Sequence, residues 1–204
     1  MLKVLNTQLF MLINAAPNTS KLMITIATFC AEYLIYTPLI VMIFCWFKRP
    51  QTRGLILKII VTVFISLAVA AILRSFISSP RPFELAIGTN FLPHSSSNSF
   101  PSKHATFIFA ITFALFYGLK NQLNQQKLFI SCLVIGILVS WSRIYLGVHW
   151  PLDILAGILT SFGCAYLVNK QWHHIERLLL KLYSLRPIVV SKLKIIKYVT
   201  KNSN

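Results

Sequence analysis

Residues 55 to 77 read LILKIIVTVFISLAVAAILRSFI, and this stretch decides what kind of protein the chain forms. Its charged side chains are Lys58 and Arg74, which lie toward its two ends. A helix that crosses the hydrocarbon core of a membrane needs about 20 mainly apolar residues, so this stretch can make one crossing. The whole chain follows the same pattern, because 56% of its 204 residues are hydrophobic, 12% are charged and the mean hydropathy is +0.69. This balance is outside the range of a soluble domain, and we expect an integral membrane protein.

Apolar runs on both sides of this stretch predict an all-α, polytopic membrane bundle of about five spanning helices. The expected spans are residues 22–47, 55–77, 104–119, 128–145 and 151–168. Two of these runs are short for a full crossing, so their polar ends are expected to form a pocket partly below the headgroups. Residues 1–168 are predicted to be one membrane-embedded domain. Within it, residues 1–20 form an interfacial amphipathic helix, because polar residues interrupt their apolar positions.

Residues 169–204 form a basic tail, which is predicted to be an amphipathic helix on the anionic cytoplasmic surface of the membrane. A solvated and partly disordered tail is the alternative. Fourteen of the 20 Lys and Arg fall on the side shared by the first turn, the third-to-fourth turn and the tail, and six fall on the opposite side. The positive-inside rule places the larger group in the cytoplasm. The net charge of +16 could also suit nucleic acid. Most of the Lys and Arg lie in loops and in the tail, which favours binding to an anionic membrane surface, so no nucleic-acid partner is expected.

The four cysteines all lie inside apolar runs and lack paired short spacings. This pattern indicates neither a zinc site nor a disulfide framework, and buried inert thiols are expected.

Arginines and helix starts converge on the outer side of the predicted bundle. Arg74 lies near the end of the second span and Arg81 follows it, and Arg143 lies near the end of the fourth. Three arginines at a low-dielectric boundary repel one another, so we expect an anion among them. The planar donor fork of arginine matches phosphate oxygens, and helix starts near Ser102 and Pro151 add backbone N–H donors. These features predict a phosphate-binding site.

Two histidines on the same side can supply the chemistry of phosphoryl transfer. A neutral imidazole can attack phosphorus, and a protonated one can give its proton to the departing oxygen. Asp153 follows His149 by four positions. With Pro151 at the first helical position, Asp153 lies one turn into the helix and can hold the ring N–H of His149. His104 is the second histidine, at the start of the third span.

Three segments carry the signature of a known family: RSFISSPRP at 74–82, PSKH at 101–104 and SRIYLGVHWPLD at 142–153. They resemble the motifs K-x6-R-P, P-S-G-H and S-R-x5-H-x3-D of the type 2 phosphatidic acid phosphatase superfamily. The resemblance implies that His149 is the nucleophile that forms a phosphohistidine, with Asp153 as its partner and His104 as the acid for the leaving group. It also implies phosphate binding by Arg74, Arg81, Ser102 and Arg143, and it implies no metal and no other cofactor.

The chain departs from these motifs at two positions. Arg74 replaces the family's Lys and keeps the charge. Lys103 replaces a Gly that lets backbone approach phosphate. Lys103 either adds a phosphate-binding cation for a diphosphate headgroup or is a solvated side chain on the rim.

Within the superfamily, the phrases AEYL at 31–34, RPF at 81–83 and GVHWPLDI at 147–154 look like bacterial undecaprenyl pyrophosphate phosphatases. The resemblance implies a multi-pass enzyme of the bacterial inner membrane that faces the periplasm, hydrolyses undecaprenyl diphosphate and so recycles the lipid carrier of cell-wall synthesis. Phosphatidylglycerol phosphate, phosphatidic acid or lipid A are alternative substrates, and phosphate transfer to another lipid is an alternative outcome. A non-enzymatic transporter of a phosphorylated solute is the alternative from a different class, but the two related halves that it would typically show are not found.

Two features remain open on the sequence alone. Glu32, inside the first span, is either a polar residue of helix packing or an acid near the pocket. The long loop at 78–103 is either a linker or a lid beside the site.

Overall fold

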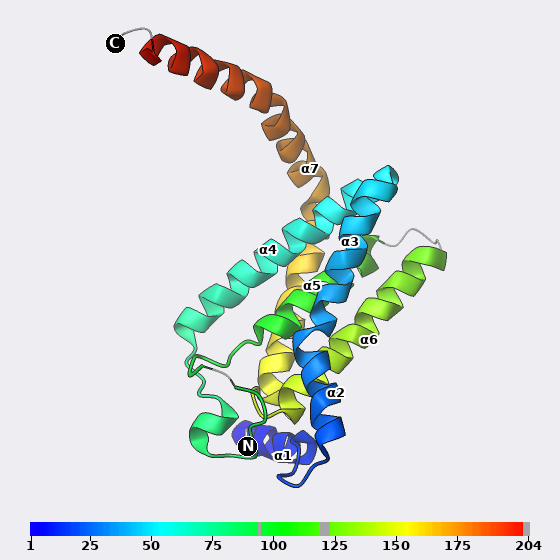
Figure 1. The fold of residues 1–204 in the computed structure, drawn as a ribbon, viewed down its shortest axis with the longest axis vertical. Helices are drawn as coiled ribbons and strands as arrows, with labels where there is room; N and C mark the ends of the chain where they lie inside the picture. Colours follow the sequence, from blue (N-terminus) through cyan, green and yellow to red (C-terminus); the bar gives the residue numbers. More distant parts are fainter. Residues whose placement is uncertain (94, 119–122, 202–204) are drawn as a thin grey trace. The chain divides into compact units, whose positions relative to one another are not determined.

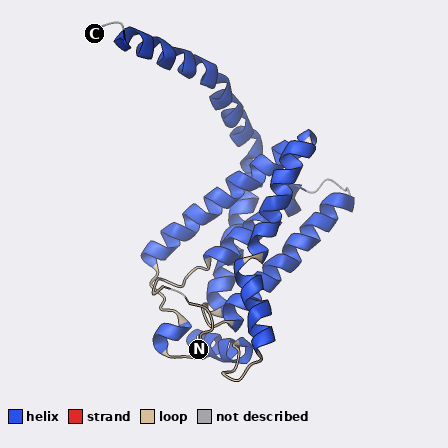
Figure 2. Ribbon diagram, viewed as in Figure 1, coloured by secondary structure: helices blue, strands red, loops and turns tan. Residues whose placement is uncertain are grey.

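The computed structural model describes residues 1–93, 95–118 and 123–201, with the side chains of the last range described for 125–181. Figure 2 shows the described part of the chain as helices joined by loops. In chain order (Figure 1) these are α1 (Leu2–Ile13), α2 (Lys21–Glu32), η1 (Leu34–Tyr36), α3 (Thr37–Lys48), η2 (Pro50–Thr52), α4 (Arg53–Phe76), η3 (Pro82–Leu85), α5 (Lys103–Gly118), α6 (Leu123–Tyr145) and α7 (Pro151–Lys201). The η elements are short 3₁₀ turns.

Among the described residues, four helical segments are long and apolar enough to cross a membrane. They are Lys21–Lys48, Pro50–Phe76, Gln125–Tyr145 and Pro151–Lys181. Many of their apolar side chains lie on the outside, as lipid contact requires, and Phe64 of α4 is 75% exposed. The predicted all-α, multi-pass membrane fold is confirmed.

The third predicted span is the shorter helix α5, which has 16 residues. At about 1.5 Å per residue it is shorter than a hydrocarbon core of about 30 Å. The helix packs against α4 and α6, and most of its residues from Ala105 to Leu115 are buried. A helix that neighbouring helices shield from lipid does not need to match the thickness of the bilayer.

The first span is not the single helix that the sequence predicts. It breaks after Glu32, passes through the turn η1 and restarts as α3 at Thr37. Pro38 explains the break, because proline has no N–H to donate to the carbonyl of Leu34 and its ring disfavours a helical approach to that carbonyl. The Thr37 hydroxyl donates to the Leu34 carbonyl at 2.8 Å instead. Glu32, Tyr33 and Tyr36, which lie at this break, line the cavity described below.

Helix α7 continues beyond the predicted end of the fifth span at Val168 and runs to Lys201. Neither Gly nor Pro occurs between Cys164 and Arg186, so the sequence offers no stop there. The chain divides into two compact units, Met1–Asn169 and Lys170–Asn204. The side chains after Lys181 lie outside the described residues, and so does the predicted contact of the tail with the membrane surface.

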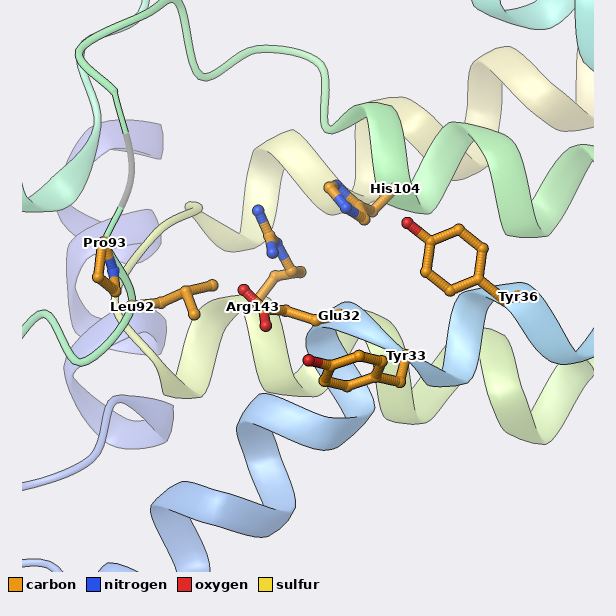
Figure 3. A pocket seen from close by; sticks show the side chains of 7 residues that line it. All are labelled: Glu32, Tyr33, Tyr36, Leu92, Pro93, His104 and Arg143. Atoms are coloured by element: carbon orange, nitrogen blue, oxygen red, sulfur yellow. The ribbon is translucent and has the colours of Figure 1, made fainter.

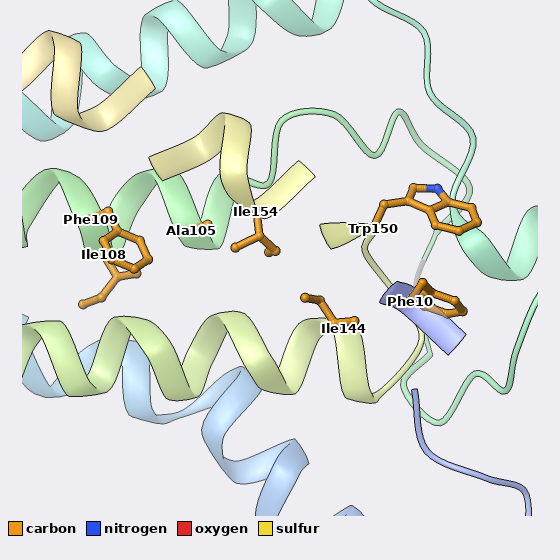
Figure 4. Close-up of a cluster of buried hydrophobic side chains, with 7 residues drawn as sticks. All are labelled: Phe10, Ala105, Ile108, Phe109, Ile144, Trp150 and Ile154. Carbon is orange, nitrogen blue, oxygen red and sulfur yellow. The ribbon is translucent and has the colours of Figure 1, made fainter. Parts of the chain in front are cut away.

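Helix α1 lies within the segment predicted to be an interfacial helix, and one of its residues belongs to the main core. Phe10 is fully buried and its ring centroid lies 5.0 Å from that of Trp150. Figure 4 shows these two rings beside the apolar side chains of α5, α6 and α7, in one cluster with Ala105, Ile108, Phe109, Ile144 and Ile154. Most other apolar side chains of α1 are exposed, among them Leu2, Leu5 and Leu12. The helix therefore packs one face against the protein and leaves an apolar face exposed.

Candidate active site

A cavity of about 380 Å³ lies at the helix ends that carry the predicted site residues. Figure 3 shows its lining side chains, Glu32, Tyr33, Tyr36, Leu92, Pro93, His104 and Arg143. His104 comes from the first turn of α5 and Arg143 from the last turn of α6. Two site residues that are distant in sequence therefore face one space, as the sequence predicted.

His149 lies in the loop between α6 and α7, and the loop is built around the carbonyl of Arg143. The backbone N–H groups of Val148 and His149 both donate to this carbonyl, at 3.1 and 3.3 Å. Gly147 adopts φ +82, and a Cβ at this position would lie 2.2 Å from the carbonyl oxygen of Thr89. Glycine is therefore required for this turn, and the turn sets the position of the following histidine.

A hydrogen-bond network holds the His149 ring on its Nδ1 side. Nδ1 lies 3.2 Å from the Ser99 hydroxyl and 3.4 Å from Asp153 Oδ2. The Ser99 hydroxyl donates to the same Oδ2, and the backbone N–H of Trp150 donates to it at 2.8 Å. Because the serine proton goes to the carboxylate, Nδ1–H donates to the serine oxygen. The network runs from ring to hydroxyl to carboxylate.

The opposite nitrogen of His149 faces a donor. Nε2 lies 3.4 Å from Arg81 Nη1, and a guanidinium can only donate, so Nε2 carries the lone pair. Burial is the largest effect on this group and lowers the pKa of His149 to about 4, although the hydrogen bond to Asp153 opposes the shift. The ring is therefore neutral at pH 7 and protonated on Nδ1, which leaves Nε2 as a nucleophile.

The other predicted arginines hold the loop that precedes α5. Arg81 is 3% exposed and donates to the carbonyls of Ser97, at 3.1 Å, and Val148, at 2.7 Å. Arg74 donates from Nη1 to the Pro101 carbonyl at 3.0 Å and from Nη2 to the Asn98 carbonyl. A guanidinium has five N–H donors, so both arginines retain donors beyond those used for the loop.

Arg143 and Ser102 carry polar atoms without partners. Among the described residues, Arg143 Nε and Ser102 Oγ are buried and lack a hydrogen-bond partner. Both side chains are almost fully buried, at 2% and 0% exposed. An unpaired buried polar group costs about 1–3 kcal/mol, and each of these two groups has a donor to offer to an anion. The backbone N–H of Ser102 donates to the Asp153 carbonyl at 3.0 Å, which joins the start of α5 to the start of α7.

Lys103 is exposed, whereas the neighbouring His104 is half-buried. Glu32, left open by the sequence, lies on the wall of the cavity. The structure therefore places this acid at the pocket rather than in helix packing.

Comparison with known proteins agrees with the geometry. Residues 55–177 match the PAP2 superfamily, and the putative undecaprenyl-diphosphatase YbjG of Escherichia coli (strain K12) is 41% identical over 166 residues, which are 80% of this chain and 81% of the relative. The chain belongs to the PAP2 superfamily. The undecaprenyl-diphosphatase BcrC of Bacillus subtilis (strain 168) is 26% identical over 80% of this chain and 82% of its own. Among solved structures, the crystal structure of Aquifex aeolicus LpxE matches with a TM-score of 0.66 at 27% identity, over 81% of this chain and 95% of that one.

The PAP2 assignment confirms the resemblance that the three motifs indicate. This PAP2 chain is a multi-pass membrane lipid phosphatase.

The sequence patterns do not predict several contacts that hold this PAP2 site together. Ser99 lies two residues before the second motif, and its spacing from His149 gives no sign that the two meet. Glu84 accepts a hydrogen bond from the Arg81 backbone N–H at 2.7 Å, and this contact of residues three apart fits a capping box. Asn14 donates to the carbonyls of Thr89 and Tyr145 at 2.9 and 3.0 Å. Of these, the capping box alone had a local sequence signal.

Proposed function

We propose that the chain hydrolyses undecaprenyl diphosphate to undecaprenyl phosphate and inorganic phosphate through a phosphohistidine at His149. One observation carries the mechanism: His149 lies between a carboxylate network on Nδ1 and an arginine donor on Nε2. A phosphoryl group attacked by Nε2 has an oxygen within reach of that arginine. The substrate assignment is supported by the names and similarity of the two curated relatives.

In the first step, His149 Nε2 forms a bond to the terminal phosphorus while the bond from phosphorus to the bridging oxygen breaks. His104 gives its proton to the bridging oxygen, and undecaprenyl phosphate leaves. Arg143 Nε and Ser102 Oγ, the unpaired buried groups, bind the equatorial oxygens together with spare donors of Arg81 and Arg74. Donors placed where charge develops are an important source of stabilisation in such reactions.

In the second step, water attacks the phosphorus, His104 accepts a proton from it and the N–P bond breaks. Inorganic phosphate then leaves, and His149 returns to its neutral form. Asp153 acts through Ser99 on the Nδ1 side of the ring throughout. Lys103 is exposed at the start of α5, where its charge can attract the diphosphate headgroup. The arginines compensate the phosphate charge that a metal ion compensates in other phosphatases, so the reaction needs no metal and no cofactor.

Residues 1–168 form the catalytic membrane domain in this proposal, and residues 169–204 are a cytoplasmic tail that binds the anionic membrane surface. The positive-inside rule places the site on the periplasmic face of the bacterial inner membrane, because the turns and tail on the opposite side carry most of the Lys and Arg.

The test is release of inorganic phosphate from undecaprenyl diphosphate by the purified protein in detergent with a chelator present. His149→Ala should abolish release while the melting temperature shows that the protein remains folded. A panel of phosphatidylglycerol phosphate, phosphatidic acid and lipid A tests the substrate class. Release that survives the substitution would remove His149 as the nucleophile, and preference for another lipid would overturn the substrate assignment.

A further inference from the structure

Glu32 is the acidic side chain on the wall of the cavity. It ends α2 at the break of the first span, beside the two tyrosines Tyr33 and Tyr36, which also line the cavity. Figure 3 shows its carboxylate beside the Arg143 side chain. The mechanism proposed above assigns no task to this carboxylate.

The charges around the cavity make an acid at this place unusual. Asp153 accepts hydrogen bonds from the Ser99 hydroxyl and the Trp150 N–H, and Glu84 accepts one from the Arg81 N–H. Glu32 is within Coulombic reach of Arg143, yet these two described side chains form no direct ion pair with each other. Arg143 and Glu32 therefore line the same cavity without forming an ion pair across it. An anion bound to Arg143 lies opposite the negative charge of Glu32.

We propose that Glu32 weakens the binding of inorganic phosphate at Arg143 and so promotes release of this product, an inference that rests on the proposed function. A carboxylate repels the bound phosphate of substrate and product alike. The substrate has a lipid chain and a second phosphate group, whose binding compensates for this repulsion. Inorganic phosphate has neither, so the repulsion mainly lowers the affinity of the site for this product.

A purely structural role for Glu32 predicts the opposite sign. If the carboxylate serves to hold Arg143 in position, its removal disorders the guanidinium and weakens phosphate binding. If the carboxylate repels phosphate, its removal strengthens binding. The direction of the change therefore separates the two roles.

The experiment measures binding of inorganic phosphate to the purified full chain by titration calorimetry in detergent, without lipid substrate. Glu32→Gln should bind phosphate about 6- to 16-fold more tightly than the unmodified chain, the range for one charge acting on a dianion at a separation of about 5–8 Å in a mainly aqueous medium. Glu176→Gln is the matched control, because it removes the same charge from the unit that does not contain the cavity, and its affinity should be unchanged. Glu32→Asp keeps the charge and should stay within about twofold.

Unchanged or weaker phosphate binding by Glu32→Gln would overturn the inference, and so would a lack of phosphate binding by both proteins. If Glu32→Gln does not fold, Glu32→Ala provides the second neutral variant, with the same expected direction. In the assay of lipid hydrolysis, the inhibition constant of phosphate should fall by the same factor. If the unmodified chain does not hydrolyse the lipid, the proposed function is contradicted. The calorimetric comparison of the unmodified chain with Glu32→Gln still decides the role of Glu32.

Discussion

Replacing Ser99 by alanine tests the network behind the nucleophile. The side chain is fully buried, its oxygen lies 3.2 Å from His149 Nδ1, and its hydroxyl donates to Asp153. The substitution removes one oxygen and leaves the direct separation of 3.4 Å between ring and carboxylate, which is long for a hydrogen bond. The Trp150 N–H remains as a donor to Asp153, so the carboxylate keeps a partner.

The size of the effect follows from the charge that develops on the ring. A hydrogen bond to a charged group contributes about 1.5–3 kcal/mol, and the bond from Nδ1 strengthens when Nε2 bonds to phosphorus and the ring becomes cationic. The part gained only in the transition state lowers kcat. At about 1.4 kcal/mol per tenfold change in rate, we expect kcat to fall about 10- to 100-fold. KM should change little, because Ser99 does not line the cavity that receives the headgroup.

The assay is phosphate release from undecaprenyl diphosphate over a range of substrate concentrations. Ser96→Ala is the matched control, since it makes the same chemical change at an exposed position of the same loop, and it should retain full activity. A Ser99→Ala protein that keeps kcat within about twofold of the unmodified chain would refute the relay from ring to hydroxyl to carboxylate. A change confined to KM would do so as well.

Three further predictions concern stability and the dependence of activity on metal ions. Phe10→Ala should lower the free energy of unfolding by about 3–5 kcal/mol, measured by denaturant titration in detergent, because it leaves a cavity beside Trp150; a change below about 1 kcal/mol would show that α1 is not anchored there. Because the folded pKa of His149, about 4, is below the value near 6.5 of an unfolded chain, the unfolded state binds the proton first as the pH falls. Up to about 3 kcal/mol of stability, fully present above pH 6.5, should therefore be lost on going down to pH 4, and His149→Gln should flatten this pH dependence. Exhaustive treatment with chelator should leave phosphate release unchanged, and activity restored only by added divalent metal would contradict the proposed chemistry.

The helical class and the meeting of distant residues could be predicted from sequence because both depend on patterns. Apolar runs of bilayer length indicate spans, and an even number of crossings between two polar segments brings those segments to one side. His104 and Arg143 were expected together for this reason, and both line the cavity. Hydropathy did not reveal the break at Pro38, because the residues on both sides of it are apolar.

Other features depend on three-dimensional contacts that leave little trace in sequence. Ser99 lies in a polar loop among other serines, and only the folded loop brings it to His149. The burial of Phe10 against Trp150 joins residues 140 positions apart. Glu32 could be recognised as unusual because an acid in an apolar run is costly, but the choice between packing and pocket needed the position of α2.

The proposed mechanism requires one phosphoryl group to fit among His149, His104 and Arg143. The most direct measurement is an experimental structure of the full chain with orthovanadate, which adopts the geometry of a phosphoryl group in transfer. We expect vanadium bonded to His149 Nε2, with an equatorial oxygen at Arg143 Nε and the His104 ring beside the apical oxygen. Vanadate bound away from His149, or His104 too distant to reach that oxygen, would contradict the account.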